Sequence, residues 1–371
     1  MQKILSLKLS LGALLRTVFL FAVTEFAYAS TETDGTMTVG KVRASAEVAF
    51  SNGKIDEALK MWEKVISMEP KNEQNYYKRF RVYLRQQKLK EAIADLSSAL
   101  AIKPDYEVVL AHRAKLNMRM GRCAEAEKDF VSIRSLNPDS KDLSLAKDAG
   151  QCKDHMYHAD LNFKQSNWQA ARDHLNVALR FAELSSMLLY HRALCNFHLG
   201  DTYEAIADTG KVLRTESDNI LALELRGNCY YVLGEFETAM NHYRQGLKFD
   251  PEHDGCKGGY RLLKKMTGFQ QKAEKAINAG DMKTAITNLI KVIEVDPEHR
   301  VTVPKANIDL SRAYKELKMF GEARSAAQRA IDSDENNAQF HRSNKQKISK
   351  NINPIKNHIY HPSTNPLLSL Y

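Results

Sequence analysis

Residues 39–72 read VGKVRASAEVAFSNGKIDEALKMWEKVISMEPKN, and residues 73–106 repeat the same pattern of small, apolar and helix-breaking residues. Proline recurs at intervals of 34 residues, at Pro70, Pro104 and Pro138. A repeat of this length is one supersecondary unit, which cannot bury its apolar face alone. The sequence therefore predicts a stack of such units with a continuous core.

Eight units can be followed when each is numbered from 1 to 34: 39–72, 73–106, 107–140, 152–185, 186–219, 220–253, 266–299 and 304–337. Position 20 is alanine in every unit: Ala58, Ala92, Ala126, Ala171, Ala205, Ala239, Ala285 and Ala323. So small a residue lets two helices approach closely, and the mostly large residue at position 24 fills the seam beside it. Where position 32 is proline, it ends the second helix.

This pattern resembles the tetratricopeptide repeat (TPR), which has two antiparallel helices and a tight turn near position 15. The resemblance implies an all-α fold, a TPR α-solenoid in which the helix pairs form a right-handed superhelix. We expect no strand.

Apart from a short break at 300–303, two longer insertions interrupt the spacing, 141–151 after the third unit and 254–265 after the sixth. They divide the array into three expected sub-blocks: 39–140 with repeats 1–3, 141–253 with repeats 4–6, and 254–337 with repeats 7–8. Both insertions mix charged residues with spaced apolar ones. We expect them to lengthen the first helices of repeats 4 and 7 backwards.

Residues 1–29 predict a secretory signal peptide. Lys3 and Lys8 precede an apolar run, and Ala27-Tyr28-Ala29 is a small-x-small cleavage signal. We expect a mature chain that begins at Ser30, enters the endoplasmic reticulum lumen and has no membrane span, since no other segment approaches 18 apolar residues.

Most of the formal net charge of +9 lies at the two ends of the chain. Residues 338–371 contain five basic residues and no acidic one, and they predict a disordered basic tail rich in Asn and Lys. The nearly balanced repeats have no overall attraction for phosphate backbones, so we expect no nucleic-acid partner.

The five cysteines are an odd number without a C-x-x-C pair: Cys123, Cys152, Cys195, Cys229 and Cys256. An oxidising lumen permits pairing, but at least one thiol must stay free or pair with another chain. The sequence leaves the pairing open.

In TPR proteins, positions 2, 5, 9, 12 and 13 of each first helix face the concave side; we call them the inner-face positions. In repeats 1–3 they include apolar residues among basic ones, which suits an extended, partly hydrophobic peptide. The candidate peptide-binding residues are Phe50, Tyr77, Arg81, Leu84, Arg85, Lys115 and Met118. Some of these could instead only cover neighbouring helices. The next candidates, in repeats 4–6, are Tyr190, Phe197 and Tyr231.

The sequence contains none of the catalytic or cofactor-binding motifs that we tested. The chain has no Gly-rich loop ending in Gly-Lys-Ser/Thr and no H-E-x-x-H, and Gly255, Gly258 and Gly259 form no dinucleotide fingerprint. Cys152, His155 and His158 would fan too widely over a helix to converge on one metal ion. We expect no enzyme, no metal and no cofactor.

The signal peptide and the TPRs in groups of three resemble the TPR–J-domain co-chaperones of the endoplasmic reticulum lumen, also described as inhibitors of an interferon-induced kinase. We call the two places where an insertion separates sub-blocks the first and second joints. The most specific match is at the second joint, from Lys248 to His253 and then Cys256, Tyr260 and Lys264-Lys265. The resemblance implies binding of unfolded polypeptides. It also implies a disulfide partner for Cys256, in whose place Gly246 stands.

The family continues into a ninth repeat and a J domain, which stimulates the ATPase of the lumenal heat-shock chaperone (BiP). Here the pattern ends after Arg342, and His361-Pro362-Ser363 lacks the Asp of the J-domain loop. We therefore expect no J domain and do not carry over the stimulation of that ATPase.

Two functions remain. The first is a lumenal co-chaperone that holds unfolded or nascent client proteins on the concave TPR face. The alternative is a TPR scaffold or regulator, for example a protein-kinase inhibitor, that binds one specific folded partner.

Overall fold

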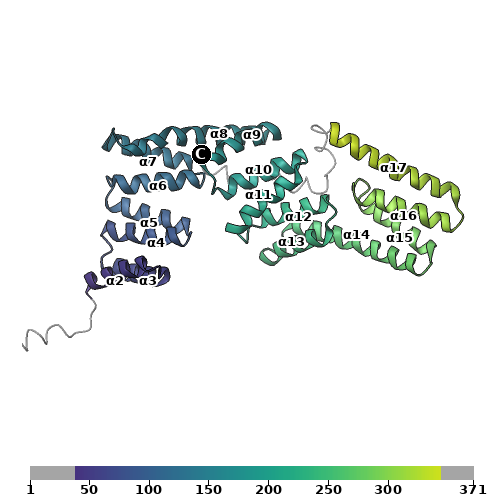
Figure 1. Cartoon of the computed structure of the whole chain (residues 1–371), viewed down its shortest axis with the longest axis horizontal. Coiled ribbons are helices and arrows are strands. Elements are labelled where there is room, and N and C mark those ends of the chain that lie inside the picture. Colours follow the sequence, from purple (N-terminus) through teal and green to yellow (C-terminus); the bar gives the residue numbers. More distant parts are fainter. Residues whose placement is uncertain (1–37, 344–371) are drawn as a thin grey trace, which may run out of the picture. The chain divides into compact units, whose positions relative to one another are not determined.

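The computed structural model describes residues 38–343, and the side chains as far as Ser333 (Figure 1). The helices are α2 (Val39–Ser51), α3 (Ile55–Met68), α4 (Glu73–Arg85), α5 (Leu89–Ile102), α6 (Glu107–Arg119), α7 (Cys123–Leu136), the 3₁₀ turn η1 (Lys141–Leu145), α8 (Ala146–Lys164), α9 (Trp168–Phe181), α10 (Ser186–Leu199), α11 (Thr202–Thr215), α12 (Ile220–Val232), α13 (Phe236–Phe249), α14 (Asp254–Asn278), α15 (Met282–Val295), α16 (Thr302–Glu316) and α17 (Phe320–Ser343). No strand occurs between residues 38 and 343, and the expected all-α fold is confirmed.

Each unit turns between its two helices at a residue with positive φ, and in all eight units this residue occupies position 15. Five are glycines and three are not: Gly53, Gly121, Gly200, Gly234, Gly280, Gln87, Ser166 and Lys318. A residue with a Cβ is strained in this left-handed conformation by about 1–2 kcal/mol, whereas glycine is not. The turns confirm the register of the repeats.

The alanines at position 20 lie in the seams between paired helices. Seven of the eight are completely shielded from solvent, and Ala323 is 8% exposed. The position 24 residues Trp62, Phe130 and Tyr243 are among the largest fully buried side chains. The expected pairing of a small with a large residue is therefore what fills the seams.

The chain divides after Arg113 into two compact units, and the division falls within α6. In unit 1, the residues up to Arg113, the core includes Trp62, Val65 and Val82. Arg79 donates two hydrogen bonds to the Asp95 carboxylate, at 2.7 and 2.9 Å, and these tie α4 to α5. The division into three sub-blocks stays a prediction.

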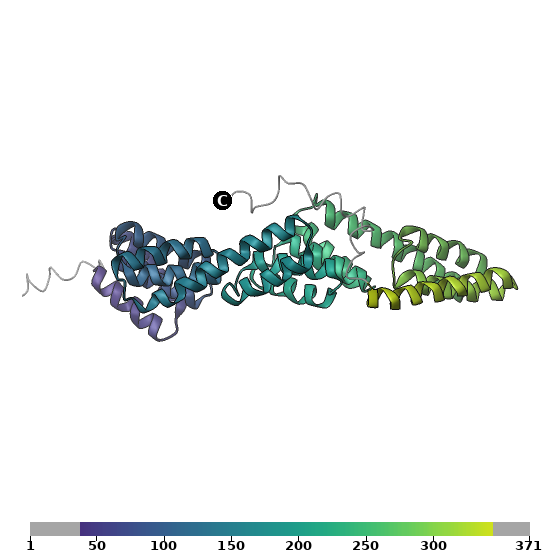
Figure 2. The same ribbon diagram turned by 90° about the horizontal axis from the view of Figure 1, so that it is seen from above.

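In unit 2, the residues from Ala114 on, the first helices of repeats 4 and 7 are long, as expected. α8 has 19 residues and follows η1, so the first insertion is partly 3₁₀ rather than one continuous α-helix. α14 has 25 residues and includes the whole second insertion. The two last helices, α16 and α17, lie side by side (Figure 2).

One disulfide joins Cys123, the first residue of α7, to Cys152 in α8. It therefore ties the lengthened helix to the preceding repeat. Cys195, Cys229 and Cys256 are free and buried. A Cβ on Gly246 would lie 2.6 Å from the Cys256 sulfur, so Gly246 lies directly opposite that thiol.

Each long helix brings a later loop back onto an earlier repeat. The Leu184 N–H, between α9 and α10, donates to the Arg119 carbonyl at the end of α6 (3.0 Å). Likewise His299, between α15 and α16, contacts the Tyr231 carbonyl near the end of α12 through Nε2 (2.9 Å). The His299 Nδ1 accepts from the Thr302 N–H (3.1 Å), so its Nε2 is the donor to Tyr231. The same arrangement occurs at both joints.

The Tyr243 ring lies between two glycines at the second joint. A Cβ on Gly227 of α12 would lie 2.6 Å from the ring, and a Cβ on Gly259 of α14 would lie 2.5 Å from it. The Tyr243 hydroxyl donates to the Asn228 side chain at 2.7 Å, which holds the ring in place. The joint thus requires a residue without a side chain on each side of the ring.

Some expectations fall at the edges of the described chain. The signal peptide at 1–29 and residues 344–371 lie outside the described residues. α17 continues to Ser343, so helix includes the first six residues of the expected tail. Within residues 38–343, no helix is both long and apolar enough to cross a membrane.

We predict that Gly259→Ala destabilises the protein by about 1–3 kcal/mol, because the added methyl group overlaps a ring that cannot move away. Gly258→Ala is the matched control, since a Cβ at Gly258 meets nothing within 4 Å. It should stabilise α14 by about 0.5–1 kcal/mol through helix propensity. Thermal unfolding followed by circular dichroism measures both, and equal melting temperatures would contradict the packing.

Candidate functional site

Four candidate residues in unit 1 share one face of α4, because they lie four, seven and eight residues after the first: Tyr77, Arg81, Leu84 and Arg85. Leu84 is 40% exposed and Arg85 is exposed. The Arg81 guanidinium lies over the Phe50 ring of α2, 4.9 Å from its centroid. The structure therefore brings these five candidates together as one surface, which we call the α2/α4 surface.

Tyr77 is only half-buried, but it also supports unit 1. Its hydroxyl lies 3.2 Å from the His112 Nε2. Its ring packs against Phe80 and Tyr106, with centroids 5.8 and 6.0 Å apart. Phe50 likewise packs against the core of its repeat. Leu84 and Arg85 are therefore the members of the α2/α4 surface most available to a ligand.

The other two candidates of repeats 1–3, Lys115 and Met118, belong to unit 2, and the Lys115 side chain is paired although it is 40% exposed. Lys115 donates to the Asp142 carboxylate of η1 at 2.6 Å. Met118 is 7% exposed, so the expectation of an open methionine is wrong. The loop between α9 and α10 contacts the next residue, Arg119, at this end of α6.

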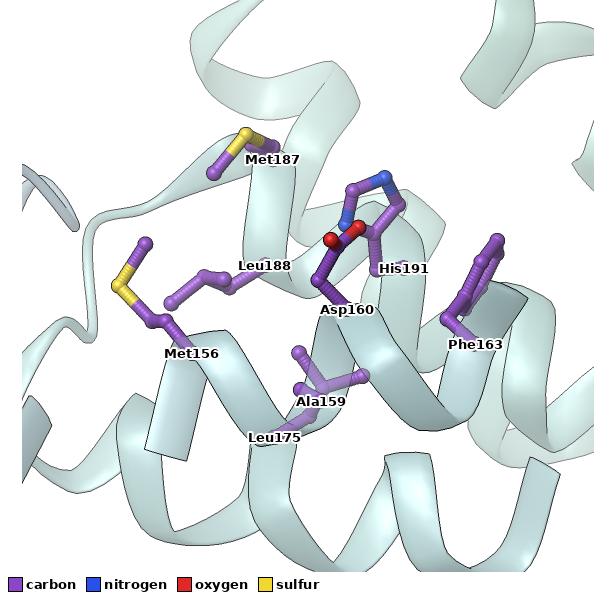
Figure 3. A pocket seen from close by; sticks show the side chains of 8 residues that line it. All are labelled: Met156, Ala159, Asp160, Phe163, Leu175, Met187, Leu188 and His191. Carbon is purple, nitrogen blue, oxygen red and sulfur yellow. The ribbon is translucent and has the colours of Figure 1, made fainter. Parts of the chain in front are cut away.

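Unit 2 contains a hollow that the sequence did not single out (Figure 3). It lies between α8, α9 and α10 and is lined by Met156, Ala159, Asp160, Phe163, Leu175, Met187, Leu188 and His191. Met156, Asp160 and Phe163 occupy positions 5, 9 and 12 of repeat 4, and Met187 occupies position 2 of repeat 5. These are inner-face positions in the same repeat numbering that describes the α2/α4 surface.

The lining of the hollow is mostly apolar and includes one carboxylate, that of Asp160. Figure 3 shows the Asp160 carboxylate and the His191 imidazole facing each other. Burial lowers the pKa of His191 to about 4, and Asp160 opposes that shift only in part. His191 is therefore neutral at pH 7. Asp160 pairs with Lys164 at 2.6 Å, and the Lys164 side chain is 52% exposed.

The candidates of repeats 4–6 differ in how far they are buried. Tyr190 and Phe197 are half-buried and pack against the core of repeats 5 and 6. Tyr231 is 8% exposed, and its hydroxyl donates to the Asp296 carboxylate. The loop between α15 and α16 thus covers Tyr231, so this residue is not open to a peptide. Met156 and Met187, two methionines at inner-face positions of neighbouring repeats, are the sequence signal that could have indicated the hollow.

The histidines of repeat 4 contact one another across α8 and α9. His155 Nδ1 lies 3.0 Å from His174 Nδ1, and the His158 ring stacks on His174. Cys152 is in the disulfide. In the described part of the chain no three His, Cys, Asp or Glu side chains are grouped so as to hold a metal ion.

Comparison with known proteins supports the repeat assignment. Family models described as tetratricopeptide repeat match residues 43–107, 220–253 and 304–337. The chain is a tetratricopeptide-repeat solenoid. A crystal structure of the P58(IPK) TPR domain superposes with a TM-score of 0.66 at 24% identity, over 86% of this chain and 98% of that one, which shows the same fold.

Two relatives are similar in sequence. A DnaJ protein P58IPK homolog of Arabidopsis thaliana is 39% identical over 95 residues, 26% of this chain and 20% of that protein. A tetratricopeptide repeat and J domain-containing co-chaperone of Fusarium oxysporum is 25% identical over 278 residues, 75% of this chain and 53% of that protein. The resemblance of this TPR solenoid to DnaJ-type co-chaperones is confirmed. The chain spans between a fifth and about half the length of these relatives.

Proposed function

We propose that this protein is a co-chaperone that holds unfolded or nascent polypeptides on the α2/α4 surface. The observation that carries the proposal is the exposure of Leu84 beside Arg85, with the Phe50 and Tyr77 rings on the same surface. Leu84 leaves 40% of its surface exposed at an inner-face position, so the packing of the repeat does not use all of its apolar surface. It can be covered by an apolar side chain of a client.

The energy available at this surface suits weak, reversible binding. Burying the exposed part of Leu84 at ~25 cal/mol per Å² is worth about 1 kcal/mol, and the ordering of the client subtracts from it. Arg81 and Arg85 attract carbonyl groups and acidic residues of the client, which speeds encounter more than it strengthens binding. Such a surface would not select one sequence strongly.

We predict that Leu84→Ser lowers the affinity for denatured proteins about fivefold, which corresponds to the lost apolar burial. Ile102→Ser is the matched control: Ile102 is 38% exposed, nearly as much as Leu84, but it lies at the end of a second helix. Binding of three unrelated denatured proteins, measured by fluorescence anisotropy, gives the readout.

Three outcomes decide between the candidate functions. Loss of binding to all three proteins in Leu84→Ser, with Ile102→Ser unchanged, supports a client surface. Equal binding by the two variants contradicts the assignment to the α2/α4 surface. If the parent chain binds none of the three, the alternative of a regulator that binds one folded partner, such as a kinase, replaces the co-chaperone.

We also propose the endoplasmic reticulum lumen as the site of action. The signal-like residues 1–29 support it, and so does the Cys123–Cys152 disulfide, because disulfides persist in oxidising compartments.

For the expressed protein, we predict an N-terminus at Ser30 and recovery with the lumenal fraction, with Cys123 and Cys152 protected from alkylation until a reductant is added. N-terminal sequencing and mass spectrometry after alkylation test both points. A chain that begins at Met1 in the cytosol, or alkylation of Cys123 and Cys152 without a reductant, would refute the assignment.

A further inference from the structure

The hollow on repeats 4 and 5 is built from two kinds of wall. Its floor is buried and apolar: Ala159, Leu175 and Leu188 are 2–3% exposed. Its rim is formed by the half-buried Met156 of α8 and Met187 of α10, which come from two successive repeats. Figure 3 shows both methionine side chains on the same side of the hollow. A ligand there would contact two repeats at once.

The hollow is narrow as it stands. It encloses about 370 Å³ when open solvent at its mouth is included, but the centre of a water molecule can reach only about 20 Å³ of it. Methionine has three rotatable bonds and an adaptable thioether, so the rim can move without disturbing a helix. A slim, unbranched or once-branched side chain could then enter, whereas a wide aromatic ring would have to displace the buried floor.

The charge at the hollow favours one kind of residue next to the bound apolar side chain in the ligand sequence. Among the lining residues Asp160 is the one carboxylate, and His191 adds no positive charge at pH 7 because burial lowers its pKa to about 4. Lys164, its present partner, follows four residues later on α8, and surface pairs of this kind contribute little. A cationic side chain of a ligand can pair with the same carboxylate, while an acidic one is repelled.

We propose that this hollow binds one leucine or methionine side chain of an extended polypeptide, with an adjacent lysine or arginine paired to Asp160. It is a second docking position, in unit 2 and separate from the α2/α4 surface. This proposal shares one assumption with the proposed function, which is that the ligand is a polypeptide. The hollow would give unit 2 a preference for apolar-basic segments.

The test uses the full chain labelled with ¹³C at the methionine methyl groups, so that the methyl signals of Met156 and Met187 report on the hollow alone. Assignment comes from Met156→Ile and Met187→Ile. The ligands are ten-residue Gly/Ser peptides with Leu-Lys, Leu-Glu, Ser-Lys or Phe-Lys at the centre. Met68 and Met319, exposed residues of α3 and of the turn before α17, serve as internal controls.

The Leu-Lys peptide should shift the Met156 and Met187 signals in a saturable way and leave those of Met68 and Met319 unchanged. The Ser-Lys peptide should bind about tenfold more weakly, through loss of apolar burial, and the Phe-Lys peptide should also be weaker. The Leu-Glu peptide should bind about fivefold more weakly, since it replaces an attraction by a repulsion. Unmoved Met156 and Met187 signals, or equal affinity for all four peptides, would overturn the proposal.

Asp160→Asn should abolish the preference for Leu-Lys over Leu-Glu. Asp154→Asn, an equal charge change at an exposed residue of the same helix, should leave that preference intact. A preference that survives Asp160→Asn would overturn the role of this carboxylate. Leu84→Ser should not alter the shifts of Met156 and Met187, so failure of the α2/α4 surface and failure of the hollow can be told apart.

Discussion

Each repeat of this protein depends on the close approach of its two helices at position 20, where all eight residues are alanines. A larger side chain there would push the helices apart and open the seam that residues such as Trp62 and Tyr243 fill. The close approach fixes how each helix pair stacks on the next. It therefore also fixes which side chains of the first helices are left at the inner-face positions, where both the α2/α4 surface and the hollow lie.

The two joints modify this regular stacking in the same way. At each joint a lengthened first helix, α8 or α14, is followed by a loop that returns to the end of an earlier first helix, α6 or α12. At the second joint the returning loop covers the inner-face residue Tyr231, and at the first joint it contacts Arg119, next to the buried Met118. The joints thus determine which inner-face positions can meet a ligand.

Local patterns predicted the repeats well, because alanine at position 20 and the turn at position 15 act within one unit. They also predicted the long helices at the joints. They failed for Tyr231, because the loop that covers it lies 65 residues further along the chain, and they failed for Met118, which is buried beside the contact of a later loop with Arg119. The hollow was missed for a different reason: its lining combines Met156 and Met187, which come from separate repeats, with the small Ala159.

The central claim is that polypeptides bind at the inner-face positions of the first helices. Hydrogen exchange followed by mass spectrometry, with and without an excess of a denatured protein, tests it most directly. The account predicts slower exchange in α4, α8 and α10 when the client is present, with little change in the second helices α5 and α9. Protection confined to α5 and α9, or none anywhere in the chain under saturating client, would contradict it.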